Sequence, residues 1–440
     1  MGGSSDDEDV DLHALTRAVE AEDPVCHACH GRLVADRSFG LINAQRGKAL
    51  RIAHALQEDN PYEPPEQAAC WVCEGECTRF DIWSDRVIEA IDGIEFDTYQ
   101  IGCRVPPLLE ENEGLLREVA GLAVDAGEPL KGELNREVGK RVGAATGASA
   151  DLERPDIVAL LHLERGTVEV SINPAFVYGR YRKLERDIPQ TEWPCTDCGG
   201  SGKQLGETGE EPCTGCDGTG YRYDQSVEGF TVPHVVEVMD GREGLFHGAG
   251  REDVDARMLG TGRPFVVEVK DPRRRRPDVE TLETTINEAG EGIVEVDGLV
   301  LVTYEMVERV KELPASKTYR MTVEFGDPVT EASLGTAIER LNGATIEQRT
   351  PRRVRHRRSD LMRTRQVYAC VGERVNETTA EIEVHGEGGL YVKELISGDD
   401  GGTKPSLAGE LGIEAHVRTL DVMSVNGEDE PFVQSSHLLE

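Results

Sequence analysis

The chain has 440 residues, and its 48 lysines and arginines against 83 aspartates and glutamates give a formal net charge of −35 at pH 7. This length accommodates two or three domains of ordinary size. No apolar run approaches the roughly 18 residues that a membrane-spanning helix needs, which argues against a membrane protein. The charge excludes an ordinary basic nucleic-acid-binding protein. Two explanations remain: either nucleic acid is not the partner, or the acid excess is an adaptation to high salt.

The first part of the chain combines an acidic tail with paired cysteines. Residues 1–24 are acidic and lack the apolar core of a signal peptide, so we expect a cytoplasmic protein. The next region, 25–192, opens with two Cys-x2-Cys pairs, which in a cytoplasmic chain indicate a tetrahedral zinc site rather than disulfides. The expected ligands are Cys26, Cys29, Cys70 and Cys73. The nearby Cys77 remains an alternative to Cys73.

Helical and strand patterns alternate over the rest of this region. Alternating apolar residues predict strands at 92–101 and 166–172, and helical spacing predicts helices at 108–120 and 130–142. A basic and aromatic patch follows at Tyr178 to Lys183. Such patches stack on bases and neutralise phosphates. The candidate RNA-binding residues of the patch are Arg180, Arg182 and Lys183.

A second cysteine set forms a connector at residues 193–225. Two Cys-x2-Cys-x-Gly-x-Gly units supply Cys195, Cys198, Cys213 and Cys216. The glycines allow the backbone to curl around a metal, so we expect a structural zinc ribbon, with a redox role for the Cys-x2-Cys pairs as the alternative. Four sulfurs would close each site, which leaves no open position for Lewis-acid chemistry. The isolated Cys103 and Cys370 are interpreted as ordinary buried thiols.

The remaining residues, 226–440, predict one larger α/β domain. Strands are expected at 265–269, 293–303, 318–325, 367–371, 381–385 and 416–425, and helices near 281–289, 304–312 and 331–341. Because most of these strands alternate apolar and polar residues, the sheet should be mixed, largely antiparallel and covered by helices on one side. The fold class expected for the whole chain is therefore α+β.

The basic residues of this domain are concentrated in two islands. Between Arg349 and Arg365 eight arginines and one histidine stand against a single acid, Asp360, and a second island is 273–276. Basic islands on an acidic body favour a halophilic protein that keeps an anion-binding face. The alternative is that these arginines pair with the surrounding acids.

Three segments of the same domain carry groups suited to chemistry. Gly250 to Asp253 places a carboxylate beside an arginine, where the positive charge keeps the acid ionised. Lys317 to Arg320 opens a strand with an aromatic ring at its edge, and Gly388 to Leu395 brings Lys393 after a glycine turn. An acid, a stacking ring and a cation beside an arginine-rich loop are typical of an enzyme that acts on a flipped-out base.

Long motifs give the chain a family resemblance. The segments GREDVDARMLG, KTYRMTV, TPRRVRHRRSDLMRTR and GGLYVKELISGDDGGTKP, together with VYGRYRKLERDIPQTEWPC at 177–195, resemble the THUMP-containing tRNA pseudouridine synthases of archaea and animals. The resemblance spans most of residues 25–425. It implies a zinc-binding, THUMP-containing accessory domain at 25–192, the ribbon insertion at 193–225 and a pseudouridine synthase domain at 226–440. The acidic composition adds the expectation of a haloarchaeal source.

The resemblance also implies roles for individual residues. Asp253, rather than Asp255, matches the required aspartate, which attacks the target nucleotide or removes a sugar proton. Tyr319 matches the tyrosine that stacks on the base, Lys393 the cation that pairs with the aspartate, and Leu395 an apolar residue of the pocket. Further substrate contacts are expected from Arg251, Arg353, Arg355 and Arg357.

The implied reaction is isomerisation of uridines 54 and 55 in the TΨC arm of tRNA. It needs no redox or organic cofactor, and structural zinc is the only metal implied. The expected partner is tRNA, with no membrane, and the expected state is a monomer. Two alternatives remain open: a non-catalytic tRNA-binding or folding factor on the same scaffold, and a zinc-ribbon chaperone or interaction module.

Overall fold

The computed structural model describes residues 10–22, 24–206, 209–354, 359–427 and 432–439. The chain divides into two compact units, 1–173 and 174–440. The sequence analysis placed the boundary at 192, whereas the contacts divide the chain after residue 173. Strand β5 (Ala175–Lys183) pairs with strands β9 (Arg257–Lys270) and β10 (Val294–Val302), so it belongs to the sheet of the second unit. Among the described residues, no helix is long and apolar enough to cross a membrane.

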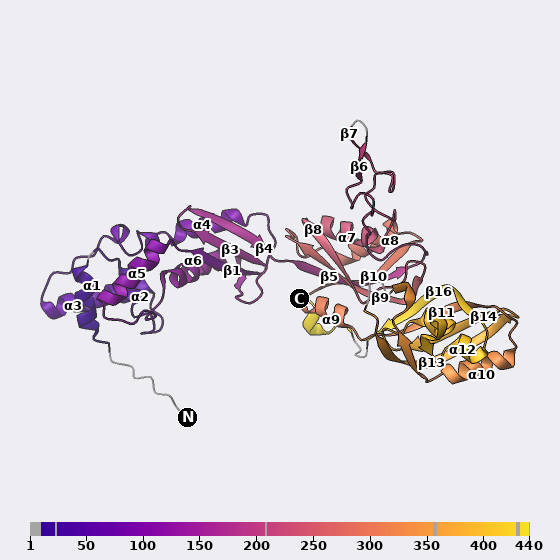
Figure 1. The fold of residues 1–440 in the computed structure, drawn as a ribbon. Helices are drawn as coiled ribbons and strands as arrows, with labels where there is room; N and C mark the ends of the chain where they lie inside the picture. The colour runs from indigo at the N-terminus through magenta and orange to yellow at the C-terminus, as the bar shows by residue number, and fades with distance from the viewer. Residues whose placement is uncertain (1–9, 23, 207–208, 355–358, 428–431, 440) are drawn as a thin grey trace, which may run out of the picture. The chain divides into compact units, whose positions relative to one another are not determined.

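The first unit is a helical region followed by a small sheet (Figure 1). Its helices are α1 (Leu12–Ala21), α2 (His27–Arg32), α3 (Asn43–Glu58), α4 (Phe80–Ala90), α5 (Pro107–Val119) and α6 (Leu130–Thr146), with 3-10 turns η1 (Gln67–Ala69) and η2 (Glu76–Thr78). Its strands are β1 (Thr98–Arg104), β2 (Ser149–Ala150), β3 (Ile157–His162) and β4 (Thr167–Ile172), in the order β2-β1-β3-β4. Helices α4 and α6 pack on this sheet, where Trp83, Leu134 and Leu161 are buried.

The second unit is built on one long sheet. Its strands, beyond those given above, are β6 (Lys203–Gly206), β7 (Gly209–Pro212), β8 (Glu243–Gly248), β11 (Ser316–Phe325), β12 (Thr345–Arg349), β13 (Met362–Asn376), β14 (Thr379–Gly386), β15 (Thr403–Lys404) and β16 (Ala415–Asn426). Its helices are α7 (Val227–Val238), α8 (Val279–Ala289), α9 (Glu305–Glu312), α10 (Glu331–Leu341), α11 (Val392–Ser397) and α12 (Leu407–Leu411), with 3-10 turns η3 (Arg352–Val354), η4 (Asp399–Gly401) and η5 (Ser435–His437).

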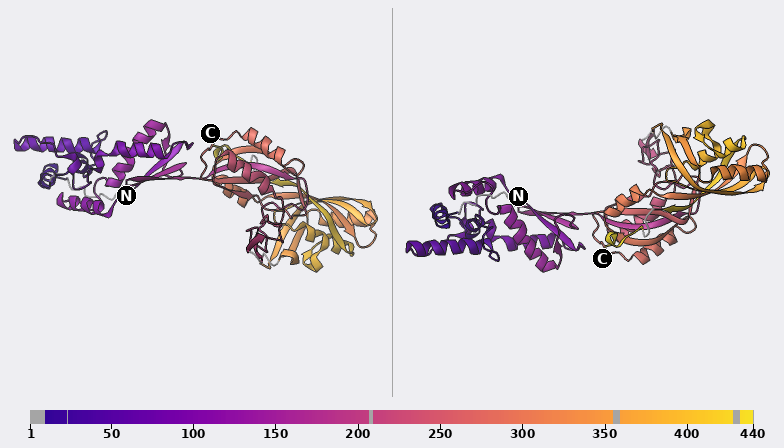
Figure 2. Two further views of the ribbon diagram at one scale, coloured as in Figure 1. Left: turned by 90° about the horizontal axis from the view of Figure 1, so that it is seen from above. Right: turned by 90° about the horizontal axis from the view of Figure 1, so that it is seen from below.

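The long sheet has two halves, which meet where β9 pairs with β16. The order is β10-β5-β9-β16-β11-β14-β13-β12-β15, with β8 paired to β9 and the short hairpin β6–β7 forming a sheet of its own. The central β9–β16 pairing is parallel, whereas the other pairings of the long sheet are antiparallel. Helices α7 and α8 cover one half and α10 and α12 the other (Figures 1 and 2). The prediction of an α+β fold with a mixed, largely antiparallel sheet is confirmed.

The structure extends one predicted strand and adds another. Strand β9 contains the strand predicted at 265–269, but it starts at Arg257, inside the charged segment that follows Asp253, and runs for 14 residues. Part of strand β5 was interpreted as an RNA-binding patch because it is basic and aromatic. In the structure β5 pairs with β9 and β10 along its two edges, and most of its residues are buried.

Candidate active site

The Asp253 carboxylate lies in the loop between β8 and β9. Gly250, at the start of this loop, has a φ of +75°, a left-handed conformation that side chains other than glycine adopt only with strain. The chain thereby makes a tight turn after β8, closed by a hydrogen bond of 2.9 Å from the Gly250 N–H to the Gly248 oxygen. Asp253 is partly buried, with 38% of its side chain exposed.

Two cations converge on the Asp253 carboxylate. Arg353 Nη1 lies 3.2 and 3.1 Å from its two oxygens, and Lys393 Nζ lies 3.2 Å from Oδ2. Burial raises the pKa of Asp253, but the charges of Arg353 and Lys393 outweigh burial, so the pKa falls below its ordinary value of 3.8. The carboxylate is therefore ionised at neutral pH.

Sheet register brings Tyr319 to the same place. Tyr319 on β11 stands opposite Val422 on β16, and Val422 stands opposite Met258, five residues after Asp253. Since neighbouring strands are about 4.8 Å apart, the tyrosine lies two strands from the start of β9. Burial raises the pKa of Tyr319 to about 12, so its phenol is neutral at physiological pH.

These side chains line one cavity of about 240 Å³. Helix α11 packs against β16 and supplies Lys393, while the turn before α11 supplies Leu390. The lining includes the acid Asp253, the phenol of Tyr319, the apolar Leu390 and Val422, and the cations Arg251, Arg263, Lys317, Arg353 and Lys393. The cavity thus presents an ionised acid, a cluster of cations and a neutral phenol beside an apolar wall.

Arg353 has a place that the sequence did not indicate. It was expected to contact RNA, but its guanidinium bridges Asp253 and the buried Glu394, with Nε 2.8 Å from Glu394 Oε1. The hydrogen bond to Glu394 orients the guanidinium so that its Nη1 contacts Asp253. The two neighbouring arginines of the prediction, Arg355 and Arg357, lie outside the described residues.

Under the loop lies a buried network that the sequence analysis misread. Glu252 is 6% exposed and accepts hydrogen bonds from Arg263 Nε at 2.9 Å and from the Tyr181 hydroxyl at 2.8 Å. Lys183 is fully buried and donates to the main-chain oxygens of Ile188 at 2.7 Å and Val254 at 3.1 Å. The interpretation of Lys183 as a phosphate-binding residue is therefore wrong: it holds the Asp253 loop from below.

The other predicted substrate contacts have partners within the protein. Arg180 donates to the main-chain oxygens of Thr261, Gly262 and Val425. Arg182 pairs with Glu295 and Asp297. The Arg251 guanidinium lies 4.6 Å from the centre of the Trp193 ring. Leu395 is fully buried in the core, and the leucines found in the cavity lining are Leu390 and Leu420.

The second cysteine set is arranged as a zinc ribbon requires. Sulfurs of Cys195, Cys198, Cys213 and Cys216 all lie within 4.8 Å of one another. The Cys198 and Cys216 sulfurs are 3.8 Å apart, which matches the edge of about 3.8 Å of a tetrahedron with Zn–S bonds of about 2.3 Å. These four residues fit a zinc ion.

The last glycine of each unit has a defined purpose. The main-chain N–H of Gly202 donates to the Cys198 sulfur at 3.3 Å, and that of Gly220 donates to the Cys216 sulfur at 3.2 Å. Both glycines have positive φ, and a Cβ atom on Gly202 would lie 2.4 Å from the Gly218 oxygen. The spacing Cys-x-Gly-x-Gly therefore encodes a turn that supports each metal-facing sulfur.

The first cysteine set contains five thiols rather than four. Cys26, Cys29, Cys73 and Cys77 lie within 4.8 Å of one another, so Cys77 joins Cys73 instead of replacing it. The predicted ligand Cys70 lies outside that group, with its sulfur 3.7 Å from that of Cys29. The structure thus gathers Cys26, Cys29, Cys73 and Cys77 as the four-sulfur set for zinc, with Cys70 as a fifth thiol beside Cys29.

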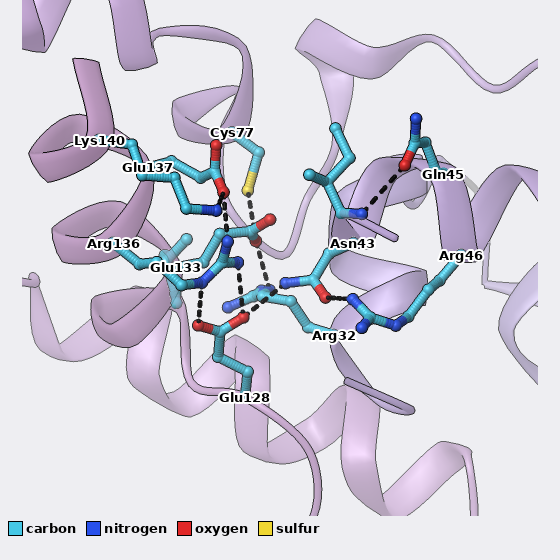
Figure 3. A network of polar contacts seen from close by, with 12 residues as sticks. Arg32, Asn43, Gln45, Arg46, Cys77, Glu128, Glu133, Arg136, Glu137 and Lys140 are labelled. Carbon is cyan, nitrogen blue, oxygen red and sulfur yellow. Dashed lines mark hydrogen bonds and ion pairs between the residues drawn. The ribbon is translucent and has the colours of Figure 1, made fainter. Parts of the chain in front are cut away.

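A buried arginine borders this first set. Figure 3 shows Arg32 near Cys77 and Glu133. Arg32 Nη2 donates to the Cys29 sulfur at 3.2 Å, and its Nε lies 3.4 Å from Glu133. Thiolates, which are the form that binds zinc, are stabilised by such a charge. The donor chemistry again fits a structural metal ion.

Comparison with known proteins assigns both units. Residues 176–426 match the family model described as "Pus10, C-terminal", and residues 83–162 match the "Pus10 THUMP domain, archaeal". The long mixed sheet and its match place the chain in the pseudouridine synthase class, with a THUMP accessory domain. More narrowly, the chain belongs to the Pus10 family.

Full-length relatives agree with this assignment. The chain is 58% identical to the tRNA pseudouridine synthase Pus10 of Halorubrum lacusprofundi, over 95% of this chain and 97% of that protein. It is 42% identical to the protein of the same name from Methanothrix thermoacetophila, over 92% of each. A crystal structure of a Cbf5-Nop10-Gar1 complex aligns at 18% identity over 44% of this chain and 45% of that one, with a TM-score of 0.29, too low to bear on fold or function.

Proposed function

We propose that the protein isomerises uridine to pseudouridine at positions 54 and 55 in the TΨC arm of tRNA. The observation that carries the proposal is the ionised Asp253 carboxylate, which Arg353 and Lys393 contact at 3.1 to 3.2 Å in a cavity that Tyr319 also lines. The name tRNA pseudouridine synthase, which relatives 58% and 42% identical to this chain carry, supports the reaction and the class of RNA. Because tRNA is the substrate, we expect the protein in the cytoplasm, acting as a monomer.

Asp253 is the group that starts the reaction. Its negative charge suits attack on the nucleotide or removal of a sugar proton, either of which leads to cleavage of the bond between uracil N1 and the ribose C1′ atom. Uracil then turns and forms the bond between C5 and C1′, and the C5 proton is lost while N1 gains one. Because the product has the composition of the substrate, no oxidant, reductant or organic cofactor is consumed.

The surrounding groups have distinct tasks. Lys393 and Arg353 keep Asp253 ionised and oriented. Tyr319 stacks on the extruded base and, as a neutral phenol with a pKa of about 12, passes a proton between ring atoms. The apolar side chains Leu390 and Val422 exclude water from the base. Any zinc bound by the cysteine sets would be structural, holding the accessory unit and the ribbon in shape.

Extraction of the base from the tRNA loop costs a few kcal/mol of stacking. Phosphate contacts normally offset this cost, but they weaken steeply with salt. The net charge of −35 and the likeness to a Halorubrum protein support a halophilic enzyme. We therefore propose that shape fit and base stacking carry more of the affinity for tRNA than in a basic enzyme of low-salt cells.

The test is an Asp253→Asn variant on unmodified tRNA, with pseudouridine mapped by carbodiimide treatment and primer extension. We expect product to disappear at both positions while tRNA binding persists, because asparagine keeps the shape and removes the charge. Asp255→Asn is the matched control, since Asp255 also contacts Lys393, at 2.8 Å, but is 61% exposed. Full activity of Asp253→Asn would overturn the proposal, and loss at one position alone would restrict it to that uridine.

A further inference from the structure

Away from the active site, two helices of the first unit bring two histidines and a glutamate together. His13 lies at the start of α1, and His54 and Glu58 lie four residues apart on α3. Residues at that spacing share one face of a helix. One ligand atom from each of the three side chains lies within 4.8 Å of the others.

Two of these ligand atoms lie beside the same nitrogen of Arg17. His13 Nε2 and Glu58 Oε1 are 2.9 Å apart, and Arg17 Nη2 lies 2.8 Å from the first and 2.9 Å from the second. The guanidinium donates to Glu58 Oε1, whereas His13 Nε2 either donates to the same carboxylate oxygen or accepts from Arg17, according to its tautomer. At ligand distances of about 2.0 to 2.1 Å, donor atoms this close subtend about 90° at an ion, an angle within metal coordination geometry.

The histidine rings are oriented as metal ligands commonly are. If Nε2 of His13 accepts from Arg17, its Nδ1 carries the proton and donates to the lone pair of His54 Nδ1, which lies 2.9 Å away; an incoming ion must displace this hydrogen bond to bind His54 Nδ1. The other ring nitrogen of His54 lies 3.6 Å from Glu20 Oε2. A carboxylate behind the second nitrogen of a metal-bound histidine fixes its tautomer and raises its basicity.

We propose that His13, His54 and Glu58 form a site for a divalent transition-metal ion that joins α1 to α3. Two imidazoles and one carboxylate suit zinc, cobalt or nickel rather than calcium or magnesium. Arg17 is the competing cation: its side chain is 62% exposed, so it can leave for solvent when an ion binds. This site is separate from the cysteine clusters and uses no sulfur.

The test uses the full-length protein with its cysteine sites already loaded with zinc. Cobalt is then titrated calorimetrically and by absorbance, because cobalt bound to thiolates gives intense charge-transfer bands that a nitrogen and oxygen site lacks. We expect one further cobalt ion per chain without those bands. His13→Ala and Glu58→Gln should each weaken this binding by more than about tenfold, since they remove a ligand itself and not only its support.

Two further variants separate a metal site from an ordinary ion-pair cluster. His416→Ala, at a histidine that is 70% exposed in the second unit, should bind as the parent does. Arg17→Gln should bind the ion more tightly, because the competing charge is gone. Zinc should also raise the melting temperature of the parent and of Arg17→Gln but not of His13→Ala.

Three outcomes of these experiments would contradict the metal site. Equal cobalt binding by the parent and His13→Ala, or no ion beyond those in the cysteine clusters, overturns the site. If Arg17→Gln binds no ion and is less stable than the parent, the cluster is a salt-bridge network alone. Circular dichroism of His13→Ala without metal checks that loss of binding does not reflect loss of the helices.

Discussion

A substitution of Lys183 tests whether this residue of strand β5 binds RNA or supports the active site. Its ammonium is fully buried and donates at 2.7 and 3.1 Å to the main-chain oxygens of Ile188 and Val254, next to Asp253. Lys183→Met keeps most of the volume and removes these bonds. The Glu252 carboxylate, 3.9 Å from the ammonium, would keep Arg263 as its partner.

The magnitude follows from the bonds that are lost. A hydrogen bond from a charged donor contributes about 1.5 to 3 kcal/mol, and burial of a methionine in place of an ammonium returns part of the loss. We expect a net destabilisation of about 3 kcal/mol. For a unit of this size that corresponds to a fall in melting temperature of roughly 6 to 12 °C. Turnover should fall as well, because the loop that carries Asp253 loses its support.

Calorimetry measures the melting temperature of the variant. The salt dependence of tRNA binding tests the competing interpretation, in which Lys183 contacts a phosphate. If Lys183 neutralised a phosphate, its loss would lower the slope of log affinity against log salt by about 0.7 to 0.9. We expect an unchanged slope. Arg182→Met is the control on the same strand: its ion pairs with Glu295 and Asp297 are partly exposed, so its loss should cost under about 1 kcal/mol. A reduced slope with unchanged stability for Lys183→Met would refute the reasoning.

Three other changes address the acid, the phenol and the metal clusters. Because Lys393 and Arg353 depress the pKa of Asp253 while burial raises it, Lys393→Met should move the acidic limb of kcat/KM to higher pH, and an unmoved limb would deny the pairing. Tyr319→Phe keeps the ring and should lower kcat by about 10²- to 10⁴-fold with unchanged affinity for tRNA; undiminished turnover would limit Tyr319 to stacking. The zinc content per chain of Cys70→Ser and of Cys77→Ser should show which thiol completes the first site. Gly220→Ala should lose the ribbon zinc, because a Cβ there would lie 2.6 Å from the Gly200 oxygen.

Local sequence patterns were sufficient for features that depend on neighbouring residues. The clustering of the four ribbon cysteines, Cys195, Cys198, Cys213 and Cys216, was predicted from spacing alone, because a four-residue turn fixes where each sulfur and each supporting N–H can point. Strands β11, β14 and β16 followed from alternation, since one face of each is buried against the core. The segment around Asp253 was found because glycine, acids and arginines are concentrated there.

The sequence was least informative about which charges face one another. Arginines and lysines in a row resemble an RNA-binding surface, whether they point to solvent or into the protein. Lys183 is buried because β9 and β10 flank β5 and the Asp253 loop covers its end. No local pattern records that a loop about 70 residues later returns to the same strand.

By itself, then, the sequence determined the features that short spacings encode: the cysteine cluster of the ribbon, the strand and helix periods, the acid and the family motifs. Only the tertiary structure decided that Arg353, 100 residues from Asp253 in the chain, is the second cation on that acid, and that Cys77 stands beside Cys73. The physical reason is that contacts between distant segments depend on strand order and register. A shift of one residue would turn Tyr319 to the opposite face of the sheet without changing any local pattern.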